Sequence, residues 1–177
     1  MSKLKIIVII IILLLLWGCT KPSATLAFEF DSEGNYSGFR DLPAHYAVKQ
    51  TEKDGYYVRL NSKEATGEEV WTAFMEDASN GKNVSLRIVN IFENKPFFQD
   101  LFYMDGYYRI FDSTSEDLKD HKFKYLLVLE GRLSNAVKSG KVTILTDNKD
   151  LTYHDIMWHY LSSTLKPISP FRLVMLE

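Results

Sequence analysis

The first 20 residues constrain this chain most, because they indicate where it folds and which cross-links it can form. Two lysines precede an unbroken apolar run, Ile6–Trp17, and a glycine and the chain's only cysteine, Cys19, follow it. A basic start, a short apolar core and a small closing residue are typical of a secretory signal. The run has 12 residues, fewer than the roughly 17–25 that a membrane-spanning helix needs. We therefore expect residues 1–18 to be a signal peptide.

The signal ends in Leu16-Trp17-Gly18-Cys19, which resembles the lipobox of bacterial lipoproteins. The resemblance implies that Cys19 becomes the mature N-terminus and carries a diacylglyceryl group that anchors it to the extracytoplasmic face of the cell membrane. One buried acyl chain binds a membrane only marginally, whereas two bind it stably. Trp17 departs from the lipobox pattern, which prefers a small or hydroxylated residue there, so an uncleaved anchor and secretion without lipid are the alternatives. The largely polar stretch that follows predicts that residues 19–27 are the lipidated cysteine and a tether.

The rest of the chain has to fold without internal disulfides, because Cys19 is the only cysteine. Residues 28–177 have the length of one domain, for which about 150 residues is the usual prior. The chain is 46% hydrophobic and 14% aromatic, enough for a core, and its many Tyr and Phe residues favour strands. Loss of the signal changes the formal charge from −2 to −4, and a mildly acidic domain lacks the basic footprint of nucleic-acid binding. We expect one globular domain over residues 28–177 and no nucleic-acid partner.

Two segments have the pattern of capped amphipathic helices. The first starts with the capping-box form Thr66–Glu69, ends at Asn80-Gly81 and has one apolar face, formed by Val70, Trp71, Phe74, Met75 and Ala78. The second starts with the related form Thr152–Asp155 and has its apolar face at Ile156, Met157, Tyr160 and Leu161.

The remaining apolar and alternating segments predict strands, and the polar segment 112–122 predicts a loop or a short helical turn. We expect a hairpin of strands 46–49 and 55–60 around Asp54-Gly55, and a second hairpin of strands 97–103 and 107–111 around Met104–Gly106. Residues 84–92 predict an interior strand that Pro96 ends, and residues 123–129 predict a second central strand. Two more strands are predicted at 141–145 and 171–176. These elements predict an α+β fold with one mixed or antiparallel sheet of about six to eight strands and two helices packed on one of its faces. The order strand, capped helix, strand occurs twice, so an old duplication is one interpretation.

Three short motifs lie in the middle of the chain: Tyr46–Lys49, Ser85–Asn90, and Asp100-Leu101 ahead of the turn Tyr103–Gly106. In these motifs the chain resembles a family of small uncharacterised lipoproteins from Bacillus and its relatives, which have a domain of unknown function. The resemblance covers about residues 46–111. It implies a location and a domain size, and it implies no activity.

The histidines and acids do not form a recognisable catalytic or metal-binding motif. No nucleophile elbow, phosphate-binding loop, dinucleotide fingerprint or zincin motif occurs. His154 and His159 are five residues apart on the predicted helix, so they point about 140° apart and do not grip one metal ion. Asp155 and His159 share a face, where a surface pair is the ordinary interpretation, and His45 and His121 are isolated in the sequence. We therefore predict no catalytic residue, metal ion or cofactor.

The acidic stretch near the start of the domain has two further interpretations. Asp31, Glu33 and Asn35 alternate as in a calcium loop, but the glycine, Gly34, stands at the fourth position and no glutamate stands at the twelfth. The stretch therefore predicts a turn. A carboxylate pair for glycoside cleavage, including Glu29, is the alternative to solvated acids in a loop.

Aromatic residues on both faces of the second hairpin suggest a binding surface, because a sheet covered on one side needs only one apolar face. The candidates are Phe98, Phe102, Tyr103, Tyr107 and Tyr108. The alternatives are that the hairpin is buried between other elements or that its rings cover each other.

The leading functional hypothesis is a membrane-anchored extracytoplasmic lipoprotein with a non-enzymatic binding module, whose partner is a cell-envelope protein or a glycan. A small exported hydrolase that uses carboxylates or histidines is the alternative, and it requires a histidine that converges with an acid in a pocket. A purely structural lipoprotein is the third hypothesis.

Overall fold

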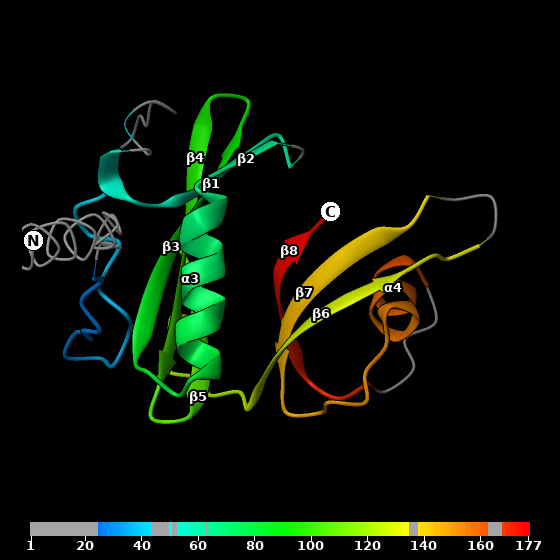
Figure 1. Cartoon of the computed structure of the whole chain (residues 1–177). Helices are drawn as coiled ribbons and strands as arrows, with labels where there is room; N and C mark the ends of the chain where they lie inside the picture. Colours follow the sequence, from blue (N-terminus) through cyan, green and yellow to red (C-terminus); the bar gives the residue numbers. More distant parts are fainter. Residues whose placement is uncertain (1–24, 44–49, 51–52, 63, 135–137, 163–167) are drawn as a thin grey trace, which may run out of the picture.

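The computed structural model describes residues 25–43, 50, 53–62, 64–134, 138–162 and 168–177. The predicted signal peptide, Cys19 and the predicted strand 46–49 lie outside this part of the chain. The described residues form two complete helices and two β-sheets (Figure 1). This arrangement confirms the α+β class.

The first sheet has the strand order β2-β1-β3-β4-β5. Its strands are β1 (Tyr57–Leu60), β2 (Glu64–Thr66), β3 (Val84–Phe92), β4 (Lys95–Met104) and β5 (Tyr107–Asp112). β1 runs parallel to β3, whereas the other neighbours are antiparallel. The prediction that residues 84–92 form an interior strand is confirmed, since β3 lies between β1 and β4.

Two-residue turns connect the long strands of this sheet. Asp105 and Gly106 have φ values of 54° and 81°, which confirms the predicted hairpin and suits its tight turn. Glu93 and Asn94, with φ values of 49° and 63°, make a similar turn between β3 and β4. Pro96 therefore lies inside β4, close to its start, and does not separate the two strands.

The predicted hairpin around Asp54-Gly55 is wrong. Asp54 is helical, and Gly55 follows it with a φ of 69°, so this glycine ends a helical turn in the left-handed conformation that such ends favour. Both edges of β1 are occupied, one by β2 and the other by β3. No edge of β1 remains for a hairpin partner.

The second sheet has the antiparallel order β6-β7-β8, with β6 (Tyr125–Gly131), β7 (Gly140–Thr146) and β8 (Phe171–Leu176). The prediction of one sheet with six to eight strands is therefore wrong, because the eight described strands are divided between two sheets. The segment predicted as a second central strand is also misplaced, since β6 is an edge strand. The polar loop 112–122 separates β5 from β6. After this loop, Phe123 makes an isolated antiparallel bridge with Tyr108 of β5, just before β6 begins.

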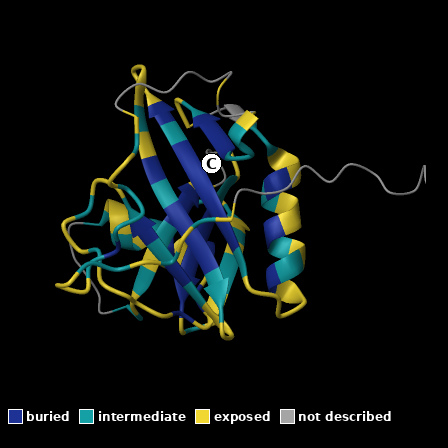
Figure 2. Ribbon diagram, turned by 90° about the vertical axis from the view of Figure 1, so that its left-hand side faces the viewer, coloured by how far each residue is buried: buried dark blue, intermediate teal, exposed yellow. Residues whose placement is uncertain are grey.

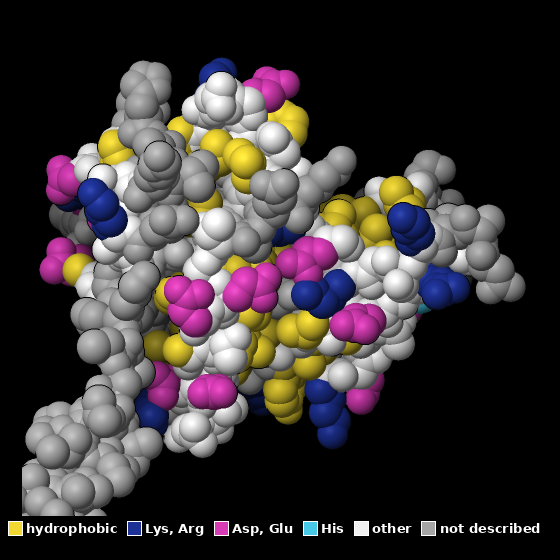
Figure 3. Space-filling model, turned by 45° about the horizontal axis from the view of Figure 1, so that its top comes forward, with side chains coloured by type: hydrophobic (Ala, Val, Ile, Leu, Met, Phe, Trp, Pro, Cys, Tyr) yellow, Lys and Arg dark blue, Asp and Glu magenta, His cyan; other side chains and the backbone are white. Residues whose placement is uncertain are grey.

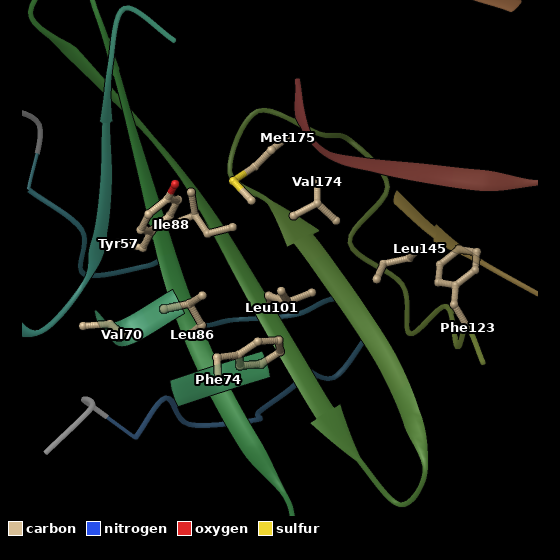
Figure 4. Close-up of a cluster of buried hydrophobic side chains, with 10 residues drawn as sticks. All are labelled: Tyr57, Val70, Phe74, Leu86, Ile88, Leu101, Phe123, Leu145, Val174 and Met175. Carbon is tan, nitrogen blue, oxygen red and sulfur yellow. The ribbon is translucent and has the colours of Figure 1, made fainter. Parts of the chain in front are cut away.

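The two sheets nevertheless share one core with α3 (Glu68–Ser79). Figure 4 shows Val70 and Phe74 of α3 on one side of this core and Val174 and Met175 of β8 on the other. Between them lie residues of β1, β3, β4 and β7, among which are Tyr57, Leu86, Ile88, Leu101 and Leu145. A shared core of this kind joins both sheets into one folding unit.

Helix α3 has the predicted apolar face, with Val70, Phe74 and Ala78 buried. Its glutamates, Glu68, Glu69 and Glu76, are exposed, and Figure 3 shows several acidic groups on the face of the molecule that it displays. The predicted capping box at Thr66 is wrong, because the N-cap is Gly67 and makes no side-chain cap. Gly67 has a φ of 81°, and a Cβ there would lie 2.6 Å from the carbonyl oxygen of Tyr56. The close approach of the backbone just before β1 thus requires glycine at this helix start.

Helix α4 (Tyr153–Leu161) has the predicted capping box. The backbone N–H of Thr152 donates to Asp155 at 2.9 Å, and the backbone N–H of Asp155 donates to the Thr152 hydroxyl at 3.2 Å. α4 packs on the second sheet through Tyr153 and Ile156. The two helices therefore do not share one sheet face as predicted. The second half of the predicted apolar face, Tyr160 and Leu161, is exposed.

The segment 25–43 covers the other face of the first sheet. Tyr36 is buried with Phe102 and Phe111, and Phe28, Phe30 and Phe39 pack against them. Figure 2 shows long buried stretches along several strands, whereas exposed residues lie in turns, in loops and along the outer side of α3. Leu26, which the sequence assigns to the tether, donates its backbone N–H to the Ser85 hydroxyl at 3.0 Å. The packed domain thus extends at least to Leu26.

The strand, helix, strand units differ in geometry, which removes the main support for a duplication. The strands on either side of α3, β1 and β3, are parallel neighbours. Those on either side of α4, β7 and β8, are antiparallel neighbours.

Candidate functional site

The five aromatic residues predicted as a binding surface do not lie on one exposed face. Phe98 and Phe102 are buried beneath the segment 25–43. Tyr103 and Tyr108 are half-buried on the opposite face, where their rings lie 4.8 Å apart beside the central core. Only Tyr107 of the five is clearly exposed, at 38%. The hairpin lies between two packed layers, so its aromatic residues serve both faces of the core.

A buried ion pair lies beneath the same segment, and among the described ion pairs it is the most enclosed. Arg87 and Asp100 stand opposite each other on β3 and β4, and the guanidinium donates two hydrogen bonds of 2.6 Å to the carboxylate. The Tyr36 hydroxyl donates to the same carboxylate at 2.7 Å, and Arg87 also donates to the carbonyl oxygen of Gly38 at 3.0 Å. This cluster ties the segment 25–43 to the sheet.

The protonation of the cluster is fixed by its surroundings. Burial, and then the charge of Asp100, raises the pKa of the Tyr36 hydroxyl far above its ordinary value. Burial lowers the pKa of Arg87, but the hydrogen bonds and charge of Asp100 outweigh this effect and raise it overall. Tyr36 therefore stays neutral and Arg87 stays charged at any physiological pH. Because the polar groups are mutually satisfied and excluded from solvent, the cluster is an anchor of the fold.

A polar cleft between the two sheets is a better candidate for a site. We call it the inter-sheet cleft; it has a volume of about 300 Å³ and is lined by Gln99, Ile110, Asp112, Thr114, Ser115, Asp117, His121, Tyr160, Phe171, Arg172 and Leu173. These residues come from β4, β5, the loop that follows β5, α4 and the start of β8. Small-ligand sites commonly begin at this volume and lie where structural units meet.

Asp117 is the centre of one hydrogen-bond network in the cleft. Its carboxylate contacts Nε2 of His121 at 3.0 Å and accepts a 2.6 Å hydrogen bond from Arg172. The hydrogen bond with His121 is the main reason that the pKa of Asp117 lies below its ordinary value, and the backbone N–H of Lys119 and the Arg172 guanidinium add to it. The network links the loop after β5 to β8, so it connects the two walls of the cleft.

Asp112 is the centre of a second network. Its carboxylate accepts hydrogen bonds from the hydroxyl and the backbone N–H of Thr114, at 2.6 and 2.8 Å, and from the side-chain amide of Gln99 at 3.1 Å. Beside these polar groups, Ile110 and Leu173 give the cleft apolar lining. The cleft thus combines fixed polar groups with an apolar surface, as ligand sites commonly do.

The described histidines, His121, His154 and His159, have different surroundings in the fold. His121, isolated in the sequence, is not isolated in the fold, because the turn after β5 brings it back onto Asp117 four residues earlier. His154 stacks on Trp158 at 5.6 Å, and His159 lies edge-on to Phe171 at 5.5 Å. His45 lies outside the described residues.

The acidic stretch near the start of the domain forms a turn, as predicted. Asp31 accepts backbone hydrogen bonds from Glu33 and Asn35 at 3.0 and 2.9 Å, and Gly34 has a φ of 76°. In the described ranges, no group of three or more His, Cys, Asp or Glu side chains is placed to hold a metal ion.

The hydroxyl groups of the cleft are not arranged as nucleophiles. The Ser115 hydroxyl donates to the carbonyl oxygen of Asp117 at 3.2 Å, and the Thr114 hydroxyl donates to Asp112. Both hydrogen bonds of His121 within the described chain go to Asp117. The histidine and acid therefore meet in a pocket, but no hydroxyl is hydrogen-bonded to the histidine as a triad requires.

A second pocket, also of about 300 Å³, lies beside the first described residues and is mostly apolar. Two of its polar side chains already hold the backbone: Ser85 accepts from Leu26, and Asn83 accepts from the N–H of Asp105 at 3.2 Å. This pocket therefore has fewer groups to orient a ligand than the inter-sheet cleft.

Comparison with family models, curated proteins and solved structures finds no match to this chain. Across the residues that the structure describes, no helix has the length and apolar character needed to cross a membrane. The function of the cleft has to be inferred from its own side chains.

Proposed function

We propose that this protein is an extracytoplasmic lipoprotein, anchored through a diacylglyceryl group on Cys19, and that its domain is a non-enzymatic binding module. The binding site in this proposal is the inter-sheet cleft. The observation that carries it is the pair of hydrogen-bond networks around Asp112 and Asp117, which hold polar side chains of both walls in place before any ligand arrives. Preorganised groups lose less entropy on binding, which favours recognition.

The anchor rests on the sequence: a short apolar run, a lipobox-like ending and a single cysteine at its end. Mass spectrometry of the mature N-terminus tests it directly. We expect a diacylated Cys19 at the N-terminus when the full chain is expressed in a bacterium. The variant Cys19→Ala is the matched control and should yield no lipidated species. An intact Met1 on the wild-type protein would instead mean that Trp17 stops processing.

The binding site is tested separately from the anchor. We expect Arg172→Gln to weaken retention of the purified full-length protein, held in detergent, on isolated cell envelope. Arg132→Gln is a suitable control, because Arg132 is exposed and does not line the cleft. Equal retention of the two variants and the wild type would place binding elsewhere. No retention of any of them would favour the purely structural lipoprotein.

A small exported hydrolase is the second candidate, and the contact between His121 and Asp117 in the cleft favours it. Such a pair can act as a general base if a substrate lies within hydrogen-bond reach. Hydrolysis of model esters or glycosides that is lost in His121→Asn, with unchanged folding, would support this function. The engaged hydroxyls of Thr114 and Ser115 are the reason that we place binding first.

A further inference from the structure

We propose that the inter-sheet cleft binds a neutral, hydroxyl-rich saccharide ring. This inference rests on the proposed binding function and names its class of ligand. Its support is the charge of the cleft, its unused hydrogen-bonding groups and its aromatic wall.

The charge of the cleft disfavours an anionic ligand. Arg172 is the fixed cation among the lining residues, and its guanidinium already contacts the carboxylate of Asp117 at 2.6 Å. Asp112 adds a second carboxylate, which is bound by the uncharged groups of Thr114 and Gln99. A site that recruits phosphate or carboxylate presents excess positive charge, whereas this one sets a single arginine against two carboxylates. An uncharged ligand fits this balance.

The unused hydrogen-bonding groups of the cleft suit hydroxyls. Within the described chain, Arg172 uses one nitrogen, Nη2, for Asp117, which leaves Nε and Nη1 as donors. The Asp112 carboxylate accepts three hydrogen bonds, and an ionised carboxylate has about four lone-pair sites. A hydroxyl both donates and accepts. Neighbouring hydroxyls on one ring therefore match a guanidinium donor and a carboxylate acceptor on facing walls.

The aromatic wall supplies a surface for the apolar face of a sugar ring. Tyr160 is 52% exposed and lies edge-on to Phe171, with ring centroids 5.9 Å apart and an interplanar angle of 81°. Burial raises the pKa of Tyr160, so its hydroxyl remains neutral and can donate. A pyranose has C–H groups on its faces and hydroxyls at its rim, and an amphipathic aromatic ring beside polar groups complements both. The volume of about 300 Å³ suits a small ligand or the end of a chain.

The saccharide has two possible sources, and the experiment separates them. The full-length protein in detergent is titrated with neutral di- and trisaccharides by calorimetry, and its sedimentation with insoluble cell-wall polysaccharide is measured in parallel. Binding in the first assay identifies a free sugar as a sufficient ligand. Binding only in the second identifies the polymer. Either result supports the inference if the cleft variants weaken it.

Two residues of helix α4 provide a matched pair of variants. Tyr160 lines the cleft and Trp158 does not, although their exposures are similar at 52% and 50%. We expect Tyr160→Ala to weaken saccharide binding by at least about tenfold, as for a central aromatic contact, and Trp158→Ala to leave it unchanged. Arg172→Gln, which lies on a different element, should weaken it as well. Thermal unfolding of each variant checks that the fold is kept.

Several outcomes would overturn the inference. Equal weakening by Tyr160→Ala and Trp158→Ala would do so, as would saccharide binding that neither Tyr160→Ala nor Arg172→Gln changes. Binding of inorganic phosphate that depends on Arg172, without any saccharide binding, would refute the ligand class while leaving the cleft as a binding site. Absence of binding to sugars, polysaccharide, phosphate and envelope would refute the proposed function together with the inference.

Discussion

The substitution Asp100→Leu is expected to lower the free energy of unfolding by about 3–5 kcal/mol, the usual cost of removing one partner from a buried ion pair. Asp100 is fully buried and accepts three hydrogen bonds, two from Arg87 and one from Tyr36. Without it, Arg87 remains buried with the carbonyl of Gly38 as its main partner. Because stable domains have only about 5–15 kcal/mol in total, this variant should be close to unfolding.

The double variant Arg87→Met, Asp100→Leu separates the charge effect from packing. Replacing both members of a buried pair with apolar residues is often neutral or stabilising by about 1–4 kcal/mol. We therefore expect the double variant to be more stable than Asp100→Leu alone, although it carries one more change. Tyr36→Phe, which removes one hydrogen bond to a charged group, should cost about 1.5–3 kcal/mol.

Urea unfolding of the full-length protein, followed by tyrosine and tryptophan fluorescence, measures all four proteins. The slopes have to agree, so that the differences report stability and not a change in the unfolded state. The reasoning is refuted if Asp100→Leu costs less than Tyr36→Phe. It is also refuted if the double variant is less stable than Asp100→Leu, because the loss would then come from shape and not from an unpaired charge.

Three further predictions concern the core, a helix cap and the cleft. Phe74→Ala should cost about 3–5 kcal/mol in urea unfolding, because its ring is fully buried in the shared core; a cost below about 1 kcal/mol would contradict that packing. Thr152→Ala removes the cap of α4 and should cost about 0.5–2 kcal/mol, whereas Thr152→Ser should cost little. The pKa of Asp117 is lowered in the folded protein, so its contacts with His121 and Arg172 stabilise the fold at neutral pH and are lost as the pH falls through that lowered pKa. Asp117→Asn should remove this part of the acid dependence, and an unchanged acid titration of stability would count against the network.

The features that the sequence predicted well are local. The turn at Asp105-Gly106, the cap at Thr152 and the buried face of α3 each depend on residues within about one turn or one hairpin of each other. The strand predicted at 171–176 agrees with β8 in both bounds. At Thr66 the sequence has the capping-box pattern, but the helix is not capped by it. The backbone just before β1 approaches Gly67 too closely for any side chain, and the helix begins there.

The division into two sheets was not predictable from the same patterns. Residues 123–129 are apolar on both faces, which we interpreted as a central strand. In the fold, Leu126 faces the core shared with the first sheet, and Leu127 and Leu129 face α4. Apolar residues on both faces of a strand therefore indicate that other elements pack above and below it. They do not report hydrogen-bonded neighbours on its edges, so an edge strand such as β6 has the same pattern.

The buried ion pair between Arg87 and Asp100 was partly predictable from the sequence, from the positions of the two charges relative to a turn. In the strand pattern of residues 84–92, Arg87 alternates with the apolar residues, which by itself names no partner for its charge. However, a two-residue turn at Glu93-Asn94 places Arg87 and Asp100 opposite each other, since each is six residues from the turn. Opposite charges at equal distances from a turn predict a cross-strand pair. The hairpin alone does not predict that the ion pair is buried. The burial comes from the segment 25–43, which packs over the pair through aromatic contacts with strands far away in the sequence.

The inter-sheet cleft was the feature least predictable from the sequence, because residues far apart along the chain form it. His121 and Arg172 are both bound to Asp117, yet Arg172 is 55 residues from it along the chain. Their meeting depends on how the second sheet packs against the first, which no local periodicity encodes. The same dependence means that the cleft exists only when both sheets are docked. A ligand that bridges Asp112 on one wall and Arg172 on the other would therefore stabilise the docked arrangement, so saccharide binding should raise the unfolding temperature of the whole domain.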